Sequence, residues 1–210
     1  FRAALGSFVN SIVLPGRVNS LSQLLLRLTA PGVPDQYQGT ELWDLSLVDP
    51  DNRRPVDFER RRTLLEEARW MTPEAACARM DEGVPKLWLL HHALAFRRRG
   101  RRHFDAPASY EPLVAEGQHA HRLVAFCRGS GAVVVVPRLV AALGKWWGEN
   151  AGAEHDAGGK GWGDTRVHLP EGAWRNVLTG EPCDAAVYAG QLLGRFPVAL
   201  LERIDERSVE

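Results

Sequence analysis

Residues 28–57 read LTAPGVPDQYQGTELWDLSLVDPDNRRPVD, and this stretch decides how the chain is interpreted. Pro31-Gly32 ends the helical pattern before it, because proline cannot continue the hydrogen-bond ladder and glycine relaxes the backbone. Residues 33–39 contain an aromatic side chain and are bounded by glycines, so we expect a short strand there. Residues 40–55 are polar and rich in turn formers, with the strongest turn signal at residues 49–52.

Helices are predicted on both sides of this stretch. Residues 2–14 carry apolar side chains at helical spacing until Pro15-Gly16 interrupts them, and a second helix is expected from residue 19 or 20 to residue 28. Beyond the polar stretch, Asp57 and Thr72 are good N-cap residues, each followed by a helical pattern. Another helix begins at Pro85. The predicted apolar faces include Phe58 and Leu94.

The pattern changes to short strands after residue 105. Apolar and β-branched runs predict strands at 110–114, 122–127, 132–136, 165–169, 174–178, 185–188 and 196–201. Residues 133–136 are four consecutive valines, which is typical of a buried strand. Residues 141–163 are rich in glycine, alanine and tryptophan without a period, so we expect a loop. The fold class is therefore α+β, with a helical part at 1–105 and an antiparallel β-sandwich domain at 106–210.

Composition excludes several classes of function. The chain has 210 residues, and its 26 lysines and arginines balance 26 aspartates and glutamates. No global field is therefore available to attract nucleic acid or anionic lipid. The three cysteines are scattered and suggest neither a disulfide framework nor a metal site, which favours a reducing cytoplasm. No apolar run is long enough for a membrane span, so no membrane partner is expected. The chain opens at Phe1 inside an amphipathic pattern, as a piece of a larger protein would.

The run from Gly32 to Glu41 resembles the GxPxxYxGxE pattern that forms the eighth barrel strand of the α-amylase superfamily (glycoside hydrolase family 13). Its continuation to Asp57 is more specific and resembles the maltooligosyl trehalose synthase family. Other stretches similar to that family are PGRVNSL (15–21), PKLWLL (85–90), GWGDT (161–165), WRNVLTG (174–180) and RFPVALL (195–201). The resemblance implies that residues 1–105 are the last β/α segment of a (β/α)8 TIM barrel with its following helices, and that residues 106–210 are the C-terminal β-sandwich.

The resemblance also implies an activity, which is an intramolecular transglucosylation in trehalose biosynthesis. The reducing-end α-1,4 linkage of a maltooligosaccharide becomes an α,α-1,1 linkage. A retaining reaction of this kind needs two carboxyl groups about 5–5.5 Å apart, one as nucleophile and one as acid. In the superfamily the catalytic carboxylates come from the fourth, fifth and seventh barrel strands. We therefore expect no catalytic residue here, no activity from the chain alone, no cofactor and no metal, and the remainder of the barrel as partner.

Substrate contacts are still expected from the segment after the eighth strand, because loops at the carboxyl ends of barrel strands build the active site. Arginine forks and carboxylates hold sugar hydroxyls, and aromatic faces stack on sugar rings. Arg53 and Phe58 also resemble the arginine and aromatic positions of an RxPMxW-type motif. A simple surface turn is the alternative for Asp51 and Arg53, and core packing is the alternative for Tyr37. The candidate substrate-binding residues are Tyr37, Glu41, Trp43, Asp44, Asp51 and Arg53.

Three other functions are weighed against this one. Another α-amylase-type glucosidase or transglucosidase would share the eighth-strand motif. A non-catalytic glucan-binding module would use tryptophans such as Trp146, Trp147 and Trp162, although ordinary packing is the simpler role for them. A nucleic-acid module built on the arginine run at 97–102 has little support, because the net charge is zero and no aromatic residues interleave the run.

Overall fold

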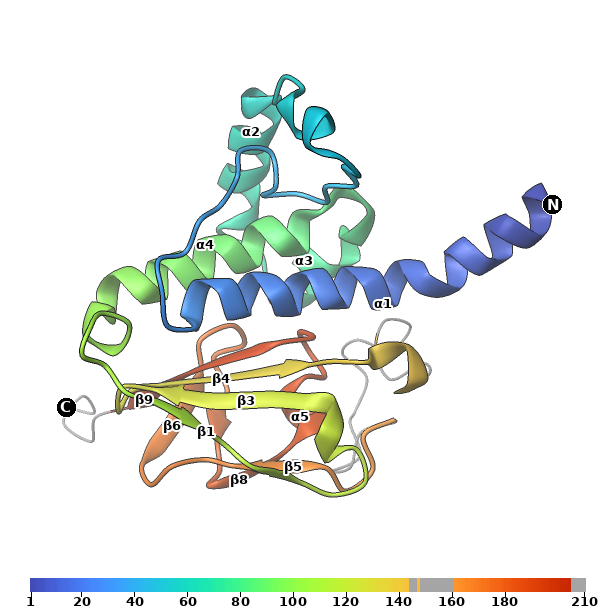
Figure 1. Ribbon diagram of the computed structural model, residues 1–210. Coiled ribbons are helices and arrows are strands. Elements are labelled where there is room, and N and C mark those ends of the chain that lie inside the picture. The colour runs from blue at the N-terminus through green and yellow to red at the C-terminus, as the bar shows by residue number, and fades with distance from the viewer. Residues whose placement is uncertain (144–146, 148–160, 205–210) are drawn as a thin grey trace.

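The computed structural model describes residues 1–143, 147 and 161–204. A layer of helices lies on one face of an antiparallel sheet, and a second, smaller sheet lies on the side away from the helices (Figure 1). The helices are α1 (Arg2–Thr29), α2 (Phe58–Ala68), α3 (Pro73–Ala78), α4 (Val84–Arg99) and α5 (Ala189–Leu192), with short 3-10 helices η1 (Asp49–Arg53), η2 (Met80–Glu82), η3 (Arg101–His103), η4 (Ala120–Arg122) and η5 (Val140–Leu143).

Helix α1 is one continuous helix of 28 residues, so the predicted interruption at Pro15-Gly16 is wrong. A proline inside a helix removes one hydrogen bond and bends the backbone, but the helix can continue past it. The half of α1 before Pro15 projects beyond the rest of the molecule, as Figure 1 shows. The buried residues of the helix begin only at Val18, so the half after Pro15 anchors it.

The strand predicted at residues 33–39 does not form. These residues have no regular secondary structure and lead into a turn closed by a hydrogen bond from the Thr40 amide to the Tyr37 carbonyl. A strand is stabilised by hydrogen bonds to neighbouring strands. All strands of the described chain begin at Tyr110 or later and pair among themselves, so none is available to this segment.

The helices after this segment begin where the capping residues predict. The Asp57 carboxylate accepts a hydrogen bond from the Arg60 amide, and the Thr72 hydroxyl accepts one from the Ala75 amide. In α4, Trp88 is fully buried and packs its ring against Phe196 of the β part. Two side chains expected in the apolar faces are not buried, since Phe58 is 53% exposed and Leu94 is 44% exposed.

The larger sheet has six strands in the order β1-β3-β4-β9-β6-β7 and the smaller has three in the order β2-β5-β8; every pairing is antiparallel. β4 is central and buried along its whole length, as the valine run predicts. The short β2 and β7 were not predicted. The bounds are β1 (Tyr110–Pro112), β2 (Ala115–Glu116), β3 (Leu123–Arg128), β4 (Ala132–Pro137), β5 (Arg166–His168), β6 (Ala173–Asn176), β7 (Pro182–Cys183), β8 (Ala186–Tyr188) and β9 (Ala199–Ile204).

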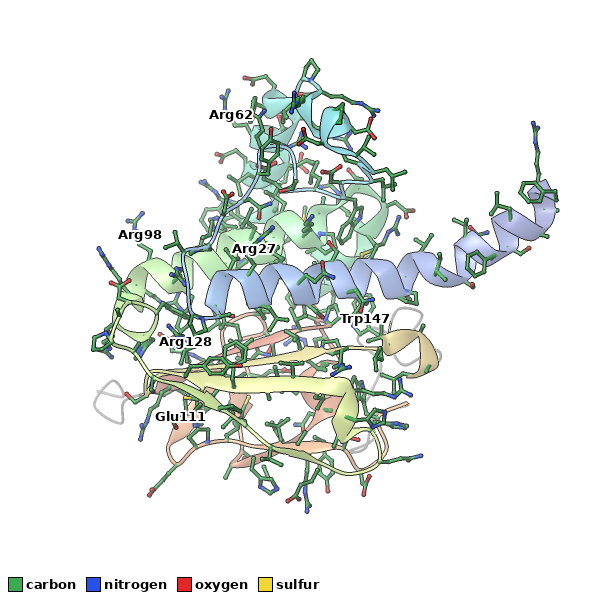
Figure 2. All side chains as sticks on the ribbon, in the orientation of Figure 1. Arg27, Arg62, Arg98, Glu111, Arg128 and Trp147 are labelled. Carbon is green, nitrogen blue, oxygen red and sulfur yellow. The ribbon has the colours of Figure 1, made fainter. Side chains whose placement is uncertain are left out.

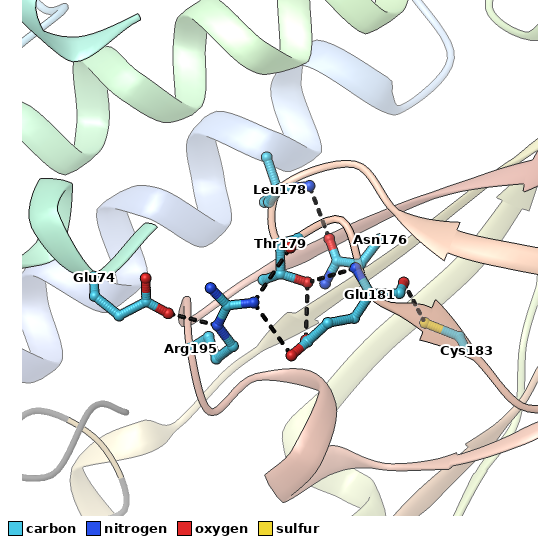
Figure 3. Close-up of polar contacts among 7 residues, drawn as sticks. All are labelled: Glu74, Asn176, Leu178, Thr179, Glu181, Cys183 and Arg195. Carbon is cyan, nitrogen blue, oxygen red and sulfur yellow. Dashed lines mark hydrogen bonds and ion pairs between the residues drawn. The ribbon is translucent and has the colours of Figure 1, made fainter. Parts of the chain in front are cut away.

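The helical layer and the sheet share one apolar core. Polar contacts add direction to this packing, because hydrogen bonds constrain geometry where apolar contacts do not. The Ser22 hydroxyl of α1 donates to the carbonyl of Pro137 at the end of β4 at 3.0 Å. Arg195 joins the two layers from the other side: its guanidinium donates to the Glu74 carboxylate of α3, to the Thr179 carbonyl and to the Glu181 carboxylate (Figure 3).

Candidate functional site

The polar segment 39–44 is attached to the helical layer by three contacts near the start of α4. The indole Nε1 of Trp43 donates to the Met80 carbonyl, and Lys86 Nζ donates to the Leu42 carbonyl at 3.0 Å. Gly83 has φ +81°, and a Cβ there would lie 2.9 Å from the Trp43 amide nitrogen. Only glycine allows this backbone conformation together with so close an approach. These contacts fix the position of residues 42 and 43 within the candidate segment, which runs from Tyr37 to Arg53.

Lys86 is a buried cation in this arrangement. It is 7% exposed, and its ammonium group lies 5.9 Å from the centre of the Trp43 ring. Burial lowers the pKa of Lys86, and the neighbouring charge of Arg27 lowers it further, whereas the carboxylates of Asp44 and Glu41 oppose the shift. Lys86 thus holds the Leu42 carbonyl in place and interacts electrostatically with the carboxylates of Glu41 and Asp44.

Tyr37 and Asp44 line one shallow pocket of about 400 Å³, together with Thr40, Leu47 and other residues of the segment up to Asp49. The Asp44 carboxylate accepts hydrogen bonds from the amide (2.9 Å) and the hydroxyl (2.5 Å) of Ser46. These bonds hold the pKa of Asp44 below its usual value. Tyr37 is 46% exposed, so the alternative that it packs in the core does not apply here. The pocket offers hydroxyl and carboxylate groups to a polar ligand.

Glu41 lies on a different surface. Its carboxylate accepts a hydrogen bond from Arg61 Nε at 2.8 Å, and both side chains are about one-fifth exposed. Arg61 also donates to the Gly39 carbonyl at 2.6 Å. The pair borders a groove between α2 and α4 rather than the pocket of Tyr37 and Asp44. The structure therefore separates Glu41 from these two candidates.

Asp51 and Arg53 lie on η1 and do not pair with each other. Arg53 is exposed and forms its ion pair with Asp49, while Asp51 accepts a hydrogen bond from Arg54 at 2.7 Å. The Asp51 amide also donates to the Val48 carbonyl at 2.9 Å. This is a turn closed by short-range ion pairs, which is the kind of arrangement that the surface-turn alternative predicts, although the partners differ.

Three side chains that orient this segment were not among the candidates. Arg61 contacts Glu41, Lys86 contacts Leu42, and Ser46 contacts Asp44. Their separations from these residues range from 2 to 44 positions, so no local motif could identify the more distant ones. Within the described residues, no group of three His, Cys, Asp or Glu side chains could hold a metal ion. None of the helices that the structure describes has the length and apolar character of a membrane span.

The tryptophans mostly support the core, and Trp88, Trp147, Trp162 and Trp174 are all buried. Figure 2 shows Trp147 beside the end of η5, next to the β part. Burial favours packing over glucan stacking for Trp147 and Trp162, while Trp146 lies outside the described residues. Trp70, at the end of α2, is 84% exposed.

Comparisons with known proteins agree on one family. Over 185 residues the chain is 39% identical to the putative maltooligosyl trehalose synthase of Mycobacterium tuberculosis, a match that covers 88% of the chain and 20% of that protein. The solved maltooligosyltrehalose synthase of Arthrobacter ramosus is 38% identical with a TM-score of 0.77, over 97% of the chain and 24% of that structure. A hypothetical maltooligosyl trehalose synthase of Sulfolobus tokodaii is 25% identical with a TM-score of 0.65, over 97% of the chain and 23% of that structure. No family model matches.

The chain spans about a fifth of the length of the curated relatives that it matches. Within the solved relative from Arthrobacter ramosus, the match corresponds to the C-terminal part. The resemblance seen in the sequence is thereby confirmed, and the chain is a homologue of the C-terminal part of the maltooligosyl trehalose synthases.

Proposed function

We propose that this chain acts as the C-terminal part of a maltooligosyl trehalose synthase, an intramolecular transglucosylase that converts the reducing-end α-1,4 linkage of maltooligosaccharides to an α,α-1,1 linkage. The observation that carries the proposal is the 39% identity to the Mycobacterium tuberculosis relative over 88% of the chain. In this assignment residues 1–105 contribute the last β/α segment of a (β/α)8 barrel, and residues 106–210 form the C-terminal β-sandwich. The enzyme acts in the cytoplasm.

The candidate residues have different roles within this proposal. Tyr37 and Asp44 share a pocket with exposed polar groups, so they contact the glucan most directly. Trp43 has its indole nitrogen bonded to Met80 and contributes the exposed part of its ring. Glu41 is held by Arg61 and orients the segment, with a ligand contact at its free oxygen. Asp51 and Arg53 form the outer turn and add charged hydrogen-bonding groups at the edge.

The catalytic carboxylates belong, in this proposal, to the part of the synthase that the chain does not cover. The contacts of two candidate carboxylates support this division. Asp44 is bonded to Ser46, and Glu41 is paired with Arg61. A retaining transfer needs one carboxyl group as an acid with a raised pKa and one as a free nucleophile. The pKa of Asp44 is lowered, which suits a binding group rather than a general acid.

The test uses maltopentaose and measures the loss of reducing ends together with the appearance of non-reducing oligosaccharide. The 210-residue chain alone gives no product. A chimera in which this chain replaces the matching segment of the Mycobacterium tuberculosis relative gives the trehalose-ended product, and Asp44→Asn in the chimera raises KM more than it lowers kcat. Free glucose or maltose as the main product would assign the chain to another α-amylase-type enzyme. Turnover by the chain alone would overturn the division of roles.

A further inference from the structure

An open groove of about 590 Å³ lies between α2 and α4 and is separate from the pocket of Tyr37 and Asp44. From α2 it is lined at positions 58, 61, 62 and 65, and from α4 at positions 87, 90, 91, 94, 95 and 98. Both sets follow the i, i+3, i+4 spacing of a single helix face. Helices α2 and α4 therefore each turn one face toward the groove.

Apolar side chains and arginines line the groove together. Phe58 and Leu94 are half exposed there, beside Leu65, Leu87 and Leu90. Half-exposed apolar side chains that two helices turn toward one groove can pack against the apolar face of a further helix.

Arg62 of α2 and Arg98 of α4 lie on the same side of the helical layer (Figure 2). Arg62 is paired with Glu59, whereas no side chain of the described residues forms an ion pair with Arg98. Among the described residues that line the groove, Glu41 is the one acidic side chain, and it is already paired with Arg61. The groove is thus suited to a ligand with an apolar face and carboxylates beside it.

The occupant must satisfy its own backbone hydrogen bonds, because helices α2 and α4 present side chains and no free strand edge to this space. A strand placed there would find no strand edge on α2 or α4, so it would gain no backbone hydrogen bonds from the groove. A helix has no such requirement, and an amphipathic helix in a groove between two others is a common mode of recognition. Its apolar residues would fit between these two faces, with acidic residues facing Arg62 and Arg98.

We propose that this groove receives one acidic amphipathic helix from the part of the maltooligosyl trehalose synthase that this chain does not cover. This inference rests on the proposed function. The matched relatives are about five times as long as the segment that they share with this chain, so they contain the polypeptide needed. A second exposed apolar stripe on α1, at Leu5, Phe8, Val9 and Ile12, gives that polypeptide another contact surface on the same helical layer.

The test co-expresses the tagged 210-residue chain with the unmatched part of the Mycobacterium tuberculosis relative. The two polypeptides co-purify in a 1:1 complex, and Leu94→Asp weakens their association about tenfold or more, as expected at the centre of an interface. Val114→Asp is the matched control, because Val114 is also exposed but lies in the β part. Arg98→Glu weakens the complex at low salt, whereas the exposed Arg138→Glu does not.

A photo-crosslinker locates the occupant and keeps the test valid where the separate part fails to fold. Benzoylphenylalanine at position 94 of the chimera crosslinks to one upstream segment, at residues spaced three or four apart and flanked by Asp or Glu. Crosslinks to a strand or a loop overturn the proposal, as does a complex unaffected by Leu94→Asp. Dimerisation of the chain alone through this groove also overturns it. A complex without trehalose-ended product would sink the proposed function and leave the groove assignment intact.

Discussion

Gly83 is the residue on which the position of the candidate segment depends most directly. Gly83→Ala places a Cβ 2.9 Å from the Trp43 amide nitrogen and 3.1 Å from Leu42 Cβ, at φ +81°. An L-residue in the left-handed region costs about 1–2 kcal/mol, and overpacking against backbone costs about 1–3 kcal/mol more. We expect a loss of about 3 kcal/mol in the free energy of unfolding, which lowers Tm by about 6–12 °C for a chain of this size.

Gly180→Ala is the matched control for this substitution. Gly180 has φ +79°, nearly the same as Gly83, but nothing lies within 4 Å of the position of its Cβ. The control therefore carries only the backbone cost, about 1–2 kcal/mol, which lowers Tm by about 2–8 °C. The assay is thermal unfolding together with hydrogen exchange of the amides at residues 40–45, which should become faster in Gly83→Ala alone. Equal losses of stability, with unchanged exchange at 40–45, would refute the reasoning.

Two further predictions concern Glu74 and His92, two titratable groups of the helical layer. Arg195→Gln removes the donor to Glu74 and the link between α3 and the β part, so stability falls by about 1–3 kcal/mol at pH 7. The double variant with Glu74→Gln recovers part of the loss in urea unfolding. The hydrogen bond from Arg195 lowers the pKa of Glu74. The coupling energy between the two side chains therefore disappears as the pH falls through that lowered pKa. A coupling energy that persists in acid would contradict the assignment of this ion pair. Burial against Trp88 lowers the pKa of His92 from 6.5 to about 4. As the pH falls, His92 is therefore protonated in the unfolded chain before it is protonated in the folded chain. The free energy of unfolding falls by about 1–3 kcal/mol between pH 6.5 and pH 4. His92→Gln should flatten that decline, and an equally steep decline in the variant rules His92 out.

The sequence predicts well those elements whose partners lie within the chain. The caps at Asp57 and Thr72 form as expected, because capping is local and needs only residues three positions away. The valine run of β4 is buried between β3 and β9, since both neighbours are present. The side chains that hold the candidate segment were harder to find. Lys86 contacts Leu42 across 44 positions, and periodicity carries no information about such pairs.

Two expectations from the sequence were wrong: the strand at residues 33–39 and the burial of Phe58 and Leu94. The groove proposal offers one explanation for both. Residues 33–39 have the composition of a strand but no strand partner in the described chain, and Phe58 and Leu94 have apolar positions but stay half exposed. A sequence pattern reflects the surroundings in which a segment is buried, including contacts that this chain does not supply. Under the groove proposal, a strand pattern without a sheet and an apolar stripe without a cover are both expected, because another polypeptide supplies the missing contacts. Binding of that part should therefore protect the amides of residues 33–39 from exchange together with those of α2 and α4. Protection of the helices with continued fast exchange at 33–39 would separate the two features and restrict the contact to the groove.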